Sequence, residues 1–494
     1  MLAFGIFAFI ASHNTSFSQV DPNPEIDYEV IIKGGAWAYV IGVLGIDNNE
    51  AFIMYGTAEE EGDGYVRTET LAHVSAQGEI LNELFFHHGG ITIGKMDISD
   101  SYLAMGYQHV EEERAYLISV FKFNRELQIE WEKVIDTMYY KEGLTFSEPR
   151  KMIIKSWNNT YYLTINGQGW SQSPCQKSVI YKMDSEGNIL MKKDIYPAAN
   201  AISDIQYISH IPGTNRFLMN TADRETVTDQ RTWVMSDETL ERVSTLVLPN
   251  PWCLLEIDLD MEYINETEFI YVGGVLLCDA NRQIGLRKGT VNNLVMKTRY
   301  FHWNRFNGPS GVRGGLWKTM ALQNNYFYIC MVDQMFNKTN NLIVAAFDHE
   351  LDSLWTAYIK RDDADYWIIS ITPMSDGSCL IGARRDFYFD DGGSTADAYF
   401  VKIKTPEVLQ NLGFVTKQKE IASVVVYPNP TSGVLRIGNG ELRIDNIEVF
   451  DVYGRKLSSY HRQHQIDISH LPTGIYIVKI NTEAGEVVRK VLKE

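Results

Sequence analysis

The chain of 494 residues is poor in cysteine and proline, with only five Cys and fourteen Pro. So few Cys in a chain of this length exclude a disulfide-built scaffold, and none lies in a Cys-x-x-Cys pair or a Cys/His spacing typical of zinc sites. An odd number leaves at least one thiol unpaired in an oxidising compartment. Cys253 and Cys278 fall in neighbouring predicted strands and could pair, while buried free thiols are the default expectation.

The sequence also lacks an apolar run long enough to cross a membrane as a helix. Residues 2–11 form an apolar run of signal-peptide length, and Ser16-Phe17-Ser18 supplies small residues where a signal peptidase reads. We therefore expect a signal peptide over residues 1–18, cleaved before Gln19. No Lys or Arg precedes the run, and we attribute the missing basic segment to a start codon set too late.

Basic residues are scarce in most of the chain. The net charge is −18, and the first 423 residues carry 36 Lys and Arg against 55 Asp and Glu. Because binding to phosphate groups depends on Lys and Arg, this balance argues against nucleic acid or anionic lipid as a partner. We interpret the excess of acidic residues as solvent-exposed charge that keeps an exported protein soluble.

Catalytic signatures are missing as well. The chain contains no HExxH, P-loop, GxSxG, WD repeat or sialidase aspartate box. A pair of carboxylates for glycoside hydrolysis cannot be picked out of 63 acidic residues by sequence. The interpretation therefore leans away from an enzyme and expects no cofactor. Calcium could bind Asp362-Asp363-Ala364-Asp365 through oxygen, but this run lacks the spacing of a known calcium loop.

What the sequence does contain is a repeat. Seven segments consist of an aliphatic or aromatic strand, a turn of four or five residues, and a second strand that begins with Leu, Ile or Val: 71–81, 120–131, 180–190, 233–243, 285–295, 344–355 and 400–409. Their first turn residues are 49, 60, 52, 53, 59 and 56 residues apart. Such spacing is typical of repeat architectures.

A second series of short apolar strands lies upstream of these hairpins, at 51–56, 102–106, 161–167, 216–220, 269–273, 326–331 and 379–382. A turn rich in Asn, Asp and Gly precedes each one, and a further strand precedes that turn. Four strands per unit and a period near fifty residues predict an all-β, seven-bladed β-propeller over residues 28–410. Residues 28–32 are expected to close the ring beside the last blade. An irregular two-sheet sandwich would explain neither series.

The loops of this propeller differ in length at its two ends. Turns between first and second strands, and between third and fourth, are short, whereas the other connections are long and gather at one end, here called the long-loop face. Exposed aromatic rings there suit stacking on sugars or gripping of peptide side chains. The predicted ligand-binding residues are Trp170, Trp252, Trp303 and Trp367. The body is interpreted as a non-catalytic binding module for a glycan or peptide, with a secreted carbohydrate-active or lyase-type enzyme as the alternative.

The last seventy residues are patterned separately. Asn429-Pro430-Thr431-Ser432-Gly433 has turn chemistry, and short strands are predicted at 434–437, 444–450, 465–468, 475–480 and 487–492. This pattern predicts a small immunoglobulin-like β-sandwich over residues 424–494. A polar linker, residues 411–423, joins it to the body.

Four motifs occur in this unit in a fixed order: Tyr427-Pro428-Asn429-Pro430-Thr431-Ser432-Gly433, Val449-Phe450-Asp451-Val452-Tyr453-Gly454-Arg455, Leu471-Pro472-Thr473-Gly474-Ile475-Tyr476-Ile477-Val478-Lys479 and Lys490-Val491-Leu492-Lys493-Glu494. Together they resemble the type A C-terminal sorting domain of the Bacteroidetes type IX secretion system. An ordinary immunoglobulin-like domain is the alternative.

The resemblance implies a partner, the type IX machinery, and a route from the periplasm to the outer-membrane surface or the medium. It also implies the sorting residues, namely Tyr427, Pro428, Asn429, Pro430, Gly433, Gly454, Gly474, Tyr476 and Lys490.

Overall fold

The computed structural model divides the chain into two compact units, Met1–Leu412 (the body) and Gly413–Glu494 (the C-terminal unit). It describes residues 20–494 except 22–23, 62–63, 87–88, 96–100, 111, 140–148, 158–159, 168–177, 196–203, 223–230, 248–254, 277–281, 302–310, 315–319, 335–340, 360–363, 390–393, 411–424, 439–443, 452–454 and 483–484. The expected signal peptide and linker, as well as Cys253 and Cys278, lie outside the described residues. The one α-helix within the described ranges is α1 (Glu407–Gln410). No described helix has the length and apolar character needed to span a membrane.

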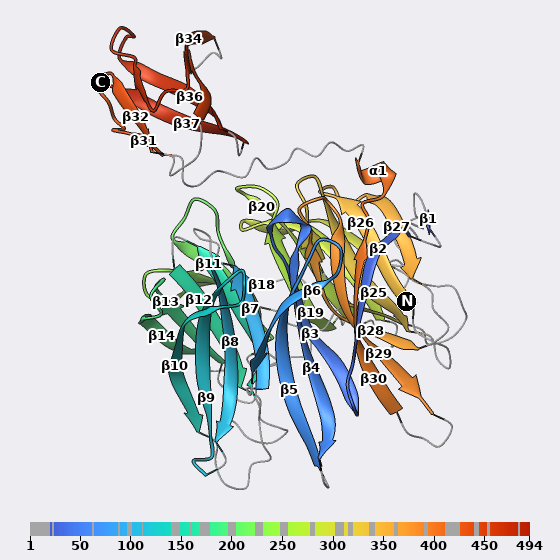
Figure 1. The fold of residues 1–494 in the computed structure, drawn as a ribbon. Coiled ribbons are helices and arrows are strands. Elements are labelled where there is room, and N and C mark those ends of the chain that lie inside the picture. The colour runs from blue at the N-terminus through green and yellow to red at the C-terminus, as the bar shows by residue number, and fades with distance from the viewer. Residues whose placement is uncertain are drawn as a thin grey trace, which may run out of the picture. The chain divides into compact units, whose positions relative to one another are not determined.

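The body is all-β, and the described strands of its first part form five antiparallel sheets of four strands each (Figure 1). Their strands are β3 (Trp37–Gly45), β4 (Ala51–Glu61), β5 (Gly64–Val74) and β6 (Ile80–Phe86); β7 (Gly89–Lys95), β8 (Ser101–Val110), β9 (Ala115–Asn124) and β10 (Ile129–Tyr139); β11 (Pro149–Trp157), β12 (Thr160–Gly167), β13 (Ser178–Met183) and β14 (Ile189–Ile195); β15 (Asp204–His210), β16 (Arg216–Ala222), β17 (Arg231–Ser236) and β18 (Arg242–Val247); β19 (Leu255–Tyr263), β20 (Glu268–Leu276), β21 (Arg282–Thr290) and β22 (Asn293–Phe301). A short 3₁₀ turn, η1 (Asp47–Asn49), joins β3 to β4.

Two further sheets complete the described part of the body, and both take in a strand from the N-terminus. The first contains β23 (Gly311–Gly314), β24 (Met320–Leu322), β25 (Tyr326–Gln334), β26 (Asn341–Asp348) and β27 (Ser353–Ile359), with β1 (Val20–Asp21) parallel to β27. The second has the order β2-β30-β29-β28, formed by β2 (Ile26–Lys33), β28 (Asp365–Pro373), β29 (Cys379–Tyr388) and β30 (Ser394–Ile403).

The predicted place of residues 28–32 beside the last sheet is confirmed, because β2 pairs antiparallel with β30 from Ile26↔Ile403 to Lys33↔Asp397. The prediction of a seventh hairpin at residues 400–409 is wrong. After β30 the chain enters α1 instead of a fourth strand. The physical reason is that β2 already occupies the edge of β30 where that strand would have paired.

Each sheet buries side chains on both of its faces, as stacked sheets require. Tyr161, Leu163 and Ile165 pack in one apolar cluster with residues of β8 and β9, while Tyr162 packs in another with residues of β15 and β16. Successive residues of β12 therefore face opposite sides of the sheet. Because successive side chains point to opposite faces, both faces of the sheet are apolar. Such a sheet is stable only when a neighbouring sheet covers each face.

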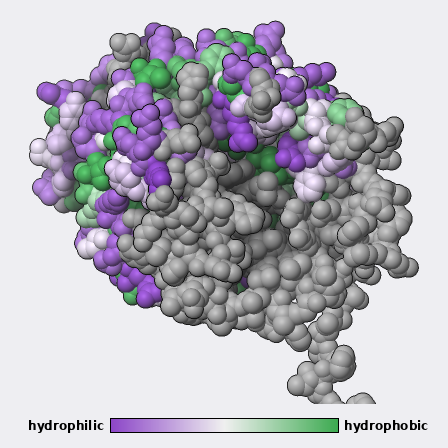
Figure 2. Space-filling model, turned by 90° about the horizontal axis from the view of Figure 1, so that it is seen from below, coloured by the Kyte–Doolittle hydropathy of each residue, from purple (hydrophilic) through white to green (hydrophobic). Residues whose placement is uncertain are grey.

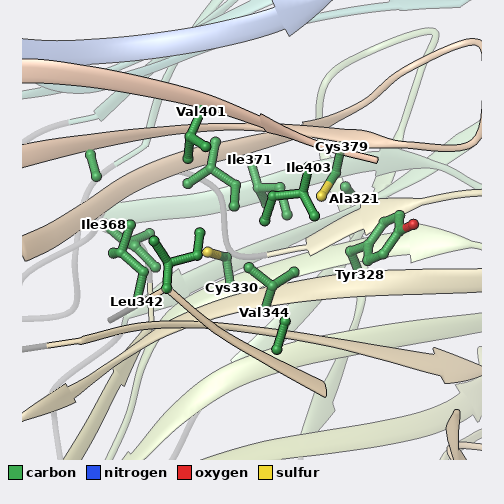
Figure 3. Packing of buried hydrophobic residues seen from close by; sticks show 14 of the residues in the cluster. Ala321, Tyr328, Cys330, Leu342, Val344, Ile368, Ile371, Cys379, Val401 and Ile403 are labelled. Atoms are coloured by element: carbon green, nitrogen blue, oxygen red, sulfur yellow. The ribbon is translucent and has the colours of Figure 1, made fainter. Parts of the chain in front are cut away.

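The largest apolar cluster lies between the sheets of β25–β27 and β28–β30 (Figure 3). Its members include the two free cysteines of the described residues, Cys330 and Cys379, both fully buried. Burial raises the pKa of both thiols well above the usual range. These two residues behave as small core side chains, as the sequence predicts for buried free cysteines.

The C-terminal unit consists of two sheets around one apolar cluster. One sheet has the order β31-β32-β35, with β31 (Val425–Tyr427), β32 (Val434–Gly438) and β35 (Gln465–Asp467). The other has the order β34-β33-β36-β37, with β33 (Ile444–Asp451), β34 (Lys456–His461), β36 (Gly474–Thr482) and β37 (Gly485–Lys493). The last strand, β37, is therefore an edge strand of its sheet.

Candidate functional sites

The long-loop face is the end of the body where the β4–β5, β8–β9 and β29–β30 hairpins turn, at the bottom of Figure 1. Figure 2 looks onto this end, where the described surface is mainly hydrophilic and hollowed toward the middle. Three of the predicted ligand-binding residues, Trp170, Trp252 and Trp303, lie outside the described residues. Trp367, the fourth, is described and lies on β28.

Trp367 belongs to a group of polar and aromatic side chains on one face of β28 and β29. In the register of these strands Trp367 lies opposite Arg384, and Asp365 lies opposite Asp386. Residues two apart on a strand share a face, so Tyr388 extends the same group along β29. We call Asp365, Trp367, Arg384, Asp386 and Tyr388 the Trp367 cluster.

The charges of the Trp367 cluster are held close together. The Arg384 guanidinium donates to Asp386 at 2.6 Å (Nη2 to Oδ2), with the Asp386 side chain only 7% exposed. Burial, together with the Asp386 and Asp365 carboxylates, raises the pKa of the Tyr388 hydroxyl. Tyr388 is nevertheless 64% exposed. The group therefore combines buried charge at its base with an open aromatic ring at its rim.

The Trp367 cluster faces the neighbouring sheet of β3–β6. Ala398 lies beside Arg384 on β30 and packs in the same apolar cluster as Ala38 and Val40 of β3. The Thr395 hydroxyl donates to the Ala36 carbonyl at 2.6 Å and ties the two sheets together just outside this row. The cluster thus lies where two adjacent sheets meet at the long-loop face.

A second aromatic group, which the sequence analysis missed, occupies the adjacent sheet. Trp37 lies in one row with Ala58 and Arg67 across β3, β4 and β5. Its ring centroid is 4.4 Å from that of Tyr65, and the Arg67 guanidinium lies 6.0 Å from the Trp37 ring. The strand-favouring residues Tyr65, Val66 and Thr68, which precede the predicted strand at 71, were the available signal, since they extend β5 toward the long-loop face.

Asp362 and Asp363 of the candidate calcium run lie outside the described residues, and Asp365 belongs to the Trp367 cluster. Within the described ranges, no three His, Cys, Asp or Glu side chains are grouped so that they could hold a metal ion.

In the C-terminal unit, the Tyr427–Gly433 motif is bound to the end of the chain. Asn429 accepts from the Leu492 amide through Oδ1 and donates to the Lys490 carbonyl through Nδ2, both at 2.9 Å. The Thr431 amide donates to the Leu492 carbonyl, and the Glu494 amide donates to the Thr431 carbonyl, again at 2.9 Å. The motif therefore caps the open edge of β37, which would otherwise offer unpaired backbone groups to another strand.

Other motif residues fix the fold of the same unit. The Thr431 hydroxyl accepts from the Gly433 amide at 3.0 Å, and Gly433 has φ 145°, which disfavours any residue with a side chain. Gly474 begins β36, and the Tyr476 hydroxyl donates to the Pro472 carbonyl at 2.6 Å. Pro428, Pro430 and Lys490 are exposed, and Tyr427 is 48% exposed. Gly454 lies outside the described residues.

Residues 425–494 match the family model described as the secretion system C-terminal sorting domain. This segment is a type IX secretion C-terminal sorting domain. The sorting domain makes the protein a secreted or cell-surface protein and implies an interaction with the type IX machinery. The capped strand is thus part of the export signal.

No curated protein matches the chain in sequence. The structure is similar to the β-propeller domain of the trilobed protease from Pyrococcus furiosus, with 12% identity, a TM-score of 0.39, and coverage of 73% of this chain and 97% of that one. It is also similar to an α-L-arabinofuranosidase from Fusarium graminearum, with 9% identity, a TM-score of 0.42, and coverage of 77% and 98%. An acylaminoacyl peptidase from Pyrococcus horikoshii has 11% identity and a TM-score of 0.41, with coverage of 84% and 61%. Likenesses this distant carry no argument about activity.

Proposed function

We propose that the protein is a type IX cargo whose body is a non-catalytic binding module, with its ligand on the long-loop face. In this proposal a signal peptide over residues 1–18 leads to the periplasm, and a linker over 411–423 separates the body from the sorting domain. The sheets of the body are the blades of a seven-bladed propeller closed by β2. The two sheets of the sorting domain form an immunoglobulin-like sandwich of type A.

The observation that carries export is the sorting-domain match. Support for binding comes from the Trp367 cluster, in which an exposed ring, a guanidinium and two carboxylates share one face at an open end of the body. Side chains at strand ends are less constrained by packing than core residues, so they can serve a ligand.

The facing carboxylates of Asp365 and Asp386 favour a second candidate, a glycoside-cleaving enzyme. Residues directly opposite on antiparallel strands have Cβ atoms roughly 4.5–5.5 Å apart. Retaining glycosidases hold their two carboxyl groups about 5–5.5 Å apart. The ion pair of Asp386 with Arg384 argues against this candidate, because it engages a carboxylate that is only 7% exposed and leaves little of it open to a substrate.

Deleting residues 424–494 should leave a folded body in the periplasm. The two units have separate cores, so the body keeps its contacts and loses only the export signal. Cell fractionation with a protease-resistance assay of the periplasmic fraction measures both properties. Surface delivery of the truncated chain would contradict the assignment of the signal.

Glycan and peptide arrays probed with the full-length protein test the binding part, followed by product analysis of every ligand found. Intact ligand supports the binding module, and cleaved ligand favours the enzyme.

A further inference from the structure

The side chains of the Trp367 cluster also indicate which class of ligand they bind. The inference rests on the proposed binding function, and it concerns the chemistry that the five side chains offer. Tyr388, 64% exposed, and Trp367, half-buried, contribute aromatic surface on one face of adjacent strands. Aromatic rings in such positions stack on flat apolar surfaces of a ligand, such as the C–H face of a sugar ring.

The polar members of the cluster offer both donors and acceptors. Arg384 is 44% exposed and keeps N–H groups beyond the one that meets Asp386. The Asp365 and Asp386 carboxylates accept hydrogen bonds only, as ionised acids do. A ligand that carries hydroxyl groups can donate to the carboxylates and accept from the guanidinium at the same time.

Charge disfavours the two other common ligand classes. Two carboxylates against one guanidinium give the cluster a formal charge of −1, and the adjacent hairpin adds Glu59, Glu60 and Glu61 against Arg67. This negative charge would repel an anionic ligand. A cationic ligand would have to lie beside Arg384, which already pairs with the more buried carboxylate at 2.6 Å. A neutral ligand with many hydroxyl groups is neither repelled by the negative charge nor placed as a cation beside Arg384.

We propose that the Trp367 cluster binds a neutral oligosaccharide, with one sugar ring against Tyr388, another against Trp367, and its hydroxyls on Arg384, Asp386 and Asp365. The site lies at the junction of two sheets, where the Thr395–Ala36 hydrogen bond keeps the neighbouring strands in place. It is therefore formed before the ligand arrives, which reduces the ordering cost of binding.

The test uses the full-length protein with three probes: a panel of neutral oligosaccharides, an oligogalacturonate and an oligolysine. We expect binding from the neutral panel only. Titration calorimetry with the tightest neutral oligosaccharide should then show about tenfold weaker binding for Tyr388→Ala, since a stacked ring contributes roughly 0.5–1.5 kcal/mol beyond its area. Asp386→Asn should weaken binding to a similar extent.

Tyr139→Ala is the matched control, because Tyr139 is an exposed tyrosine, 74% exposed, at the end of β10 in another sheet. It should bind like the unchanged protein. Tyr388 is too exposed for its loss to unfold the body. The test therefore stands on Tyr388→Ala even if replacement of the buried Asp386 disturbs the fold. Tyr388→Ala and Asp386→Asn variants that bind as tightly as Tyr139→Ala would overturn the site. Preference for a charged probe would overturn the ligand class and leave the binding function standing, whereas no ligand on any array would remove the binding function itself.

Discussion

Replacing Lys402 with Met should lower the free energy of unfolding of the body by about 3 kcal/mol. Lys402 is 2% exposed, and its ammonium group donates to Asp27 on β2 and to Asp376 in the β28–β29 turn, both at 2.9 Å. The substitution leaves two carboxylates close together without their cation. We take the lower end of the range for breaking a buried ion pair, because each carboxylate is about one third exposed.

The loss of unfolding free energy in Lys402→Met should depend on pH. Burial alone would raise the pKa of Asp376, but hydrogen bonds from Ser378 and Lys402 outweigh it and leave the pKa below its usual value. A carboxyl with a lowered folded-state pKa stabilises the fold above its ordinary pKa, and this stability is lost as the pH falls through the folded-state value. The difference between Lys402→Met and the unchanged protein should therefore shrink in acid.

Urea denaturation at neutral and acidic pH measures both effects. Lys404→Met is the matched control, since Lys404 lies two residues further on, is 45% exposed and pairs with the exposed Glu25. That variant should unfold at nearly the same urea concentration as the unchanged protein. Equal loss from the two substitutions would show that Lys402 does not hold β2 in the sheet.

Replacing Asn429 with Ala should sharply reduce delivery to the cell surface while the body remains fully folded. The substitution removes the acceptor of the Leu492 amide and the donor to the Lys490 carbonyl. Two lost hydrogen bonds destabilise the end of β37 by roughly 1–3 kcal/mol, so this edge should open more often. The exposed Lys490 would then no longer be held in a fixed position in the folded sorting domain.

Amide hydrogen exchange at Leu492 and Glu494, together with cell fractionation, follows the two consequences. Asn429→Asp keeps the acceptor and loses the donor, so its exchange and delivery should fall between those of Asn429→Ala and the unchanged protein. Normal delivery of Asn429→Ala despite fast exchange at Leu492 would mean that the machinery reads these residues without needing the cap.

The repeating part of the fold could be predicted from the sequence because each strand has a local signal. Turn residues such as Asp184 mark the hairpins: its carboxylate accepts from the Glu186 and Asn188 amides at 3.0 and 2.8 Å. The error at residues 400–409 has a non-local cause. The partner of β30 comes from β2, more than 360 residues away, and no pattern near residue 403 records that.

The candidate site could be predicted only in part. Trp367 was expected on the long-loop face, but its neighbours depend on which residue of β29 lies opposite it. That register depends on a bulge between Ile368 and Ser370, which periodicity does not show. Asp365, Arg384 and Asp386 therefore looked like any other charged residues of an acidic body. The sorting residues were recognised because they are linear motifs, whereas the cap between Asn429 and β37 required the fold.

Transfer of residues 413–494 to an unrelated periplasmic reporter shows whether this unit alone directs a folded cargo to the cell surface. The compact unit carries its own core and its capped strand, so it should fold on the new protein. In a bacterium with the type IX machinery, we expect reporter on the cell surface or in the medium, and reporter confined to the periplasm when the fusion carries Asn429→Ala. Confinement of the unaltered fusion to the periplasm, with its sorting unit folded, would contradict this expectation.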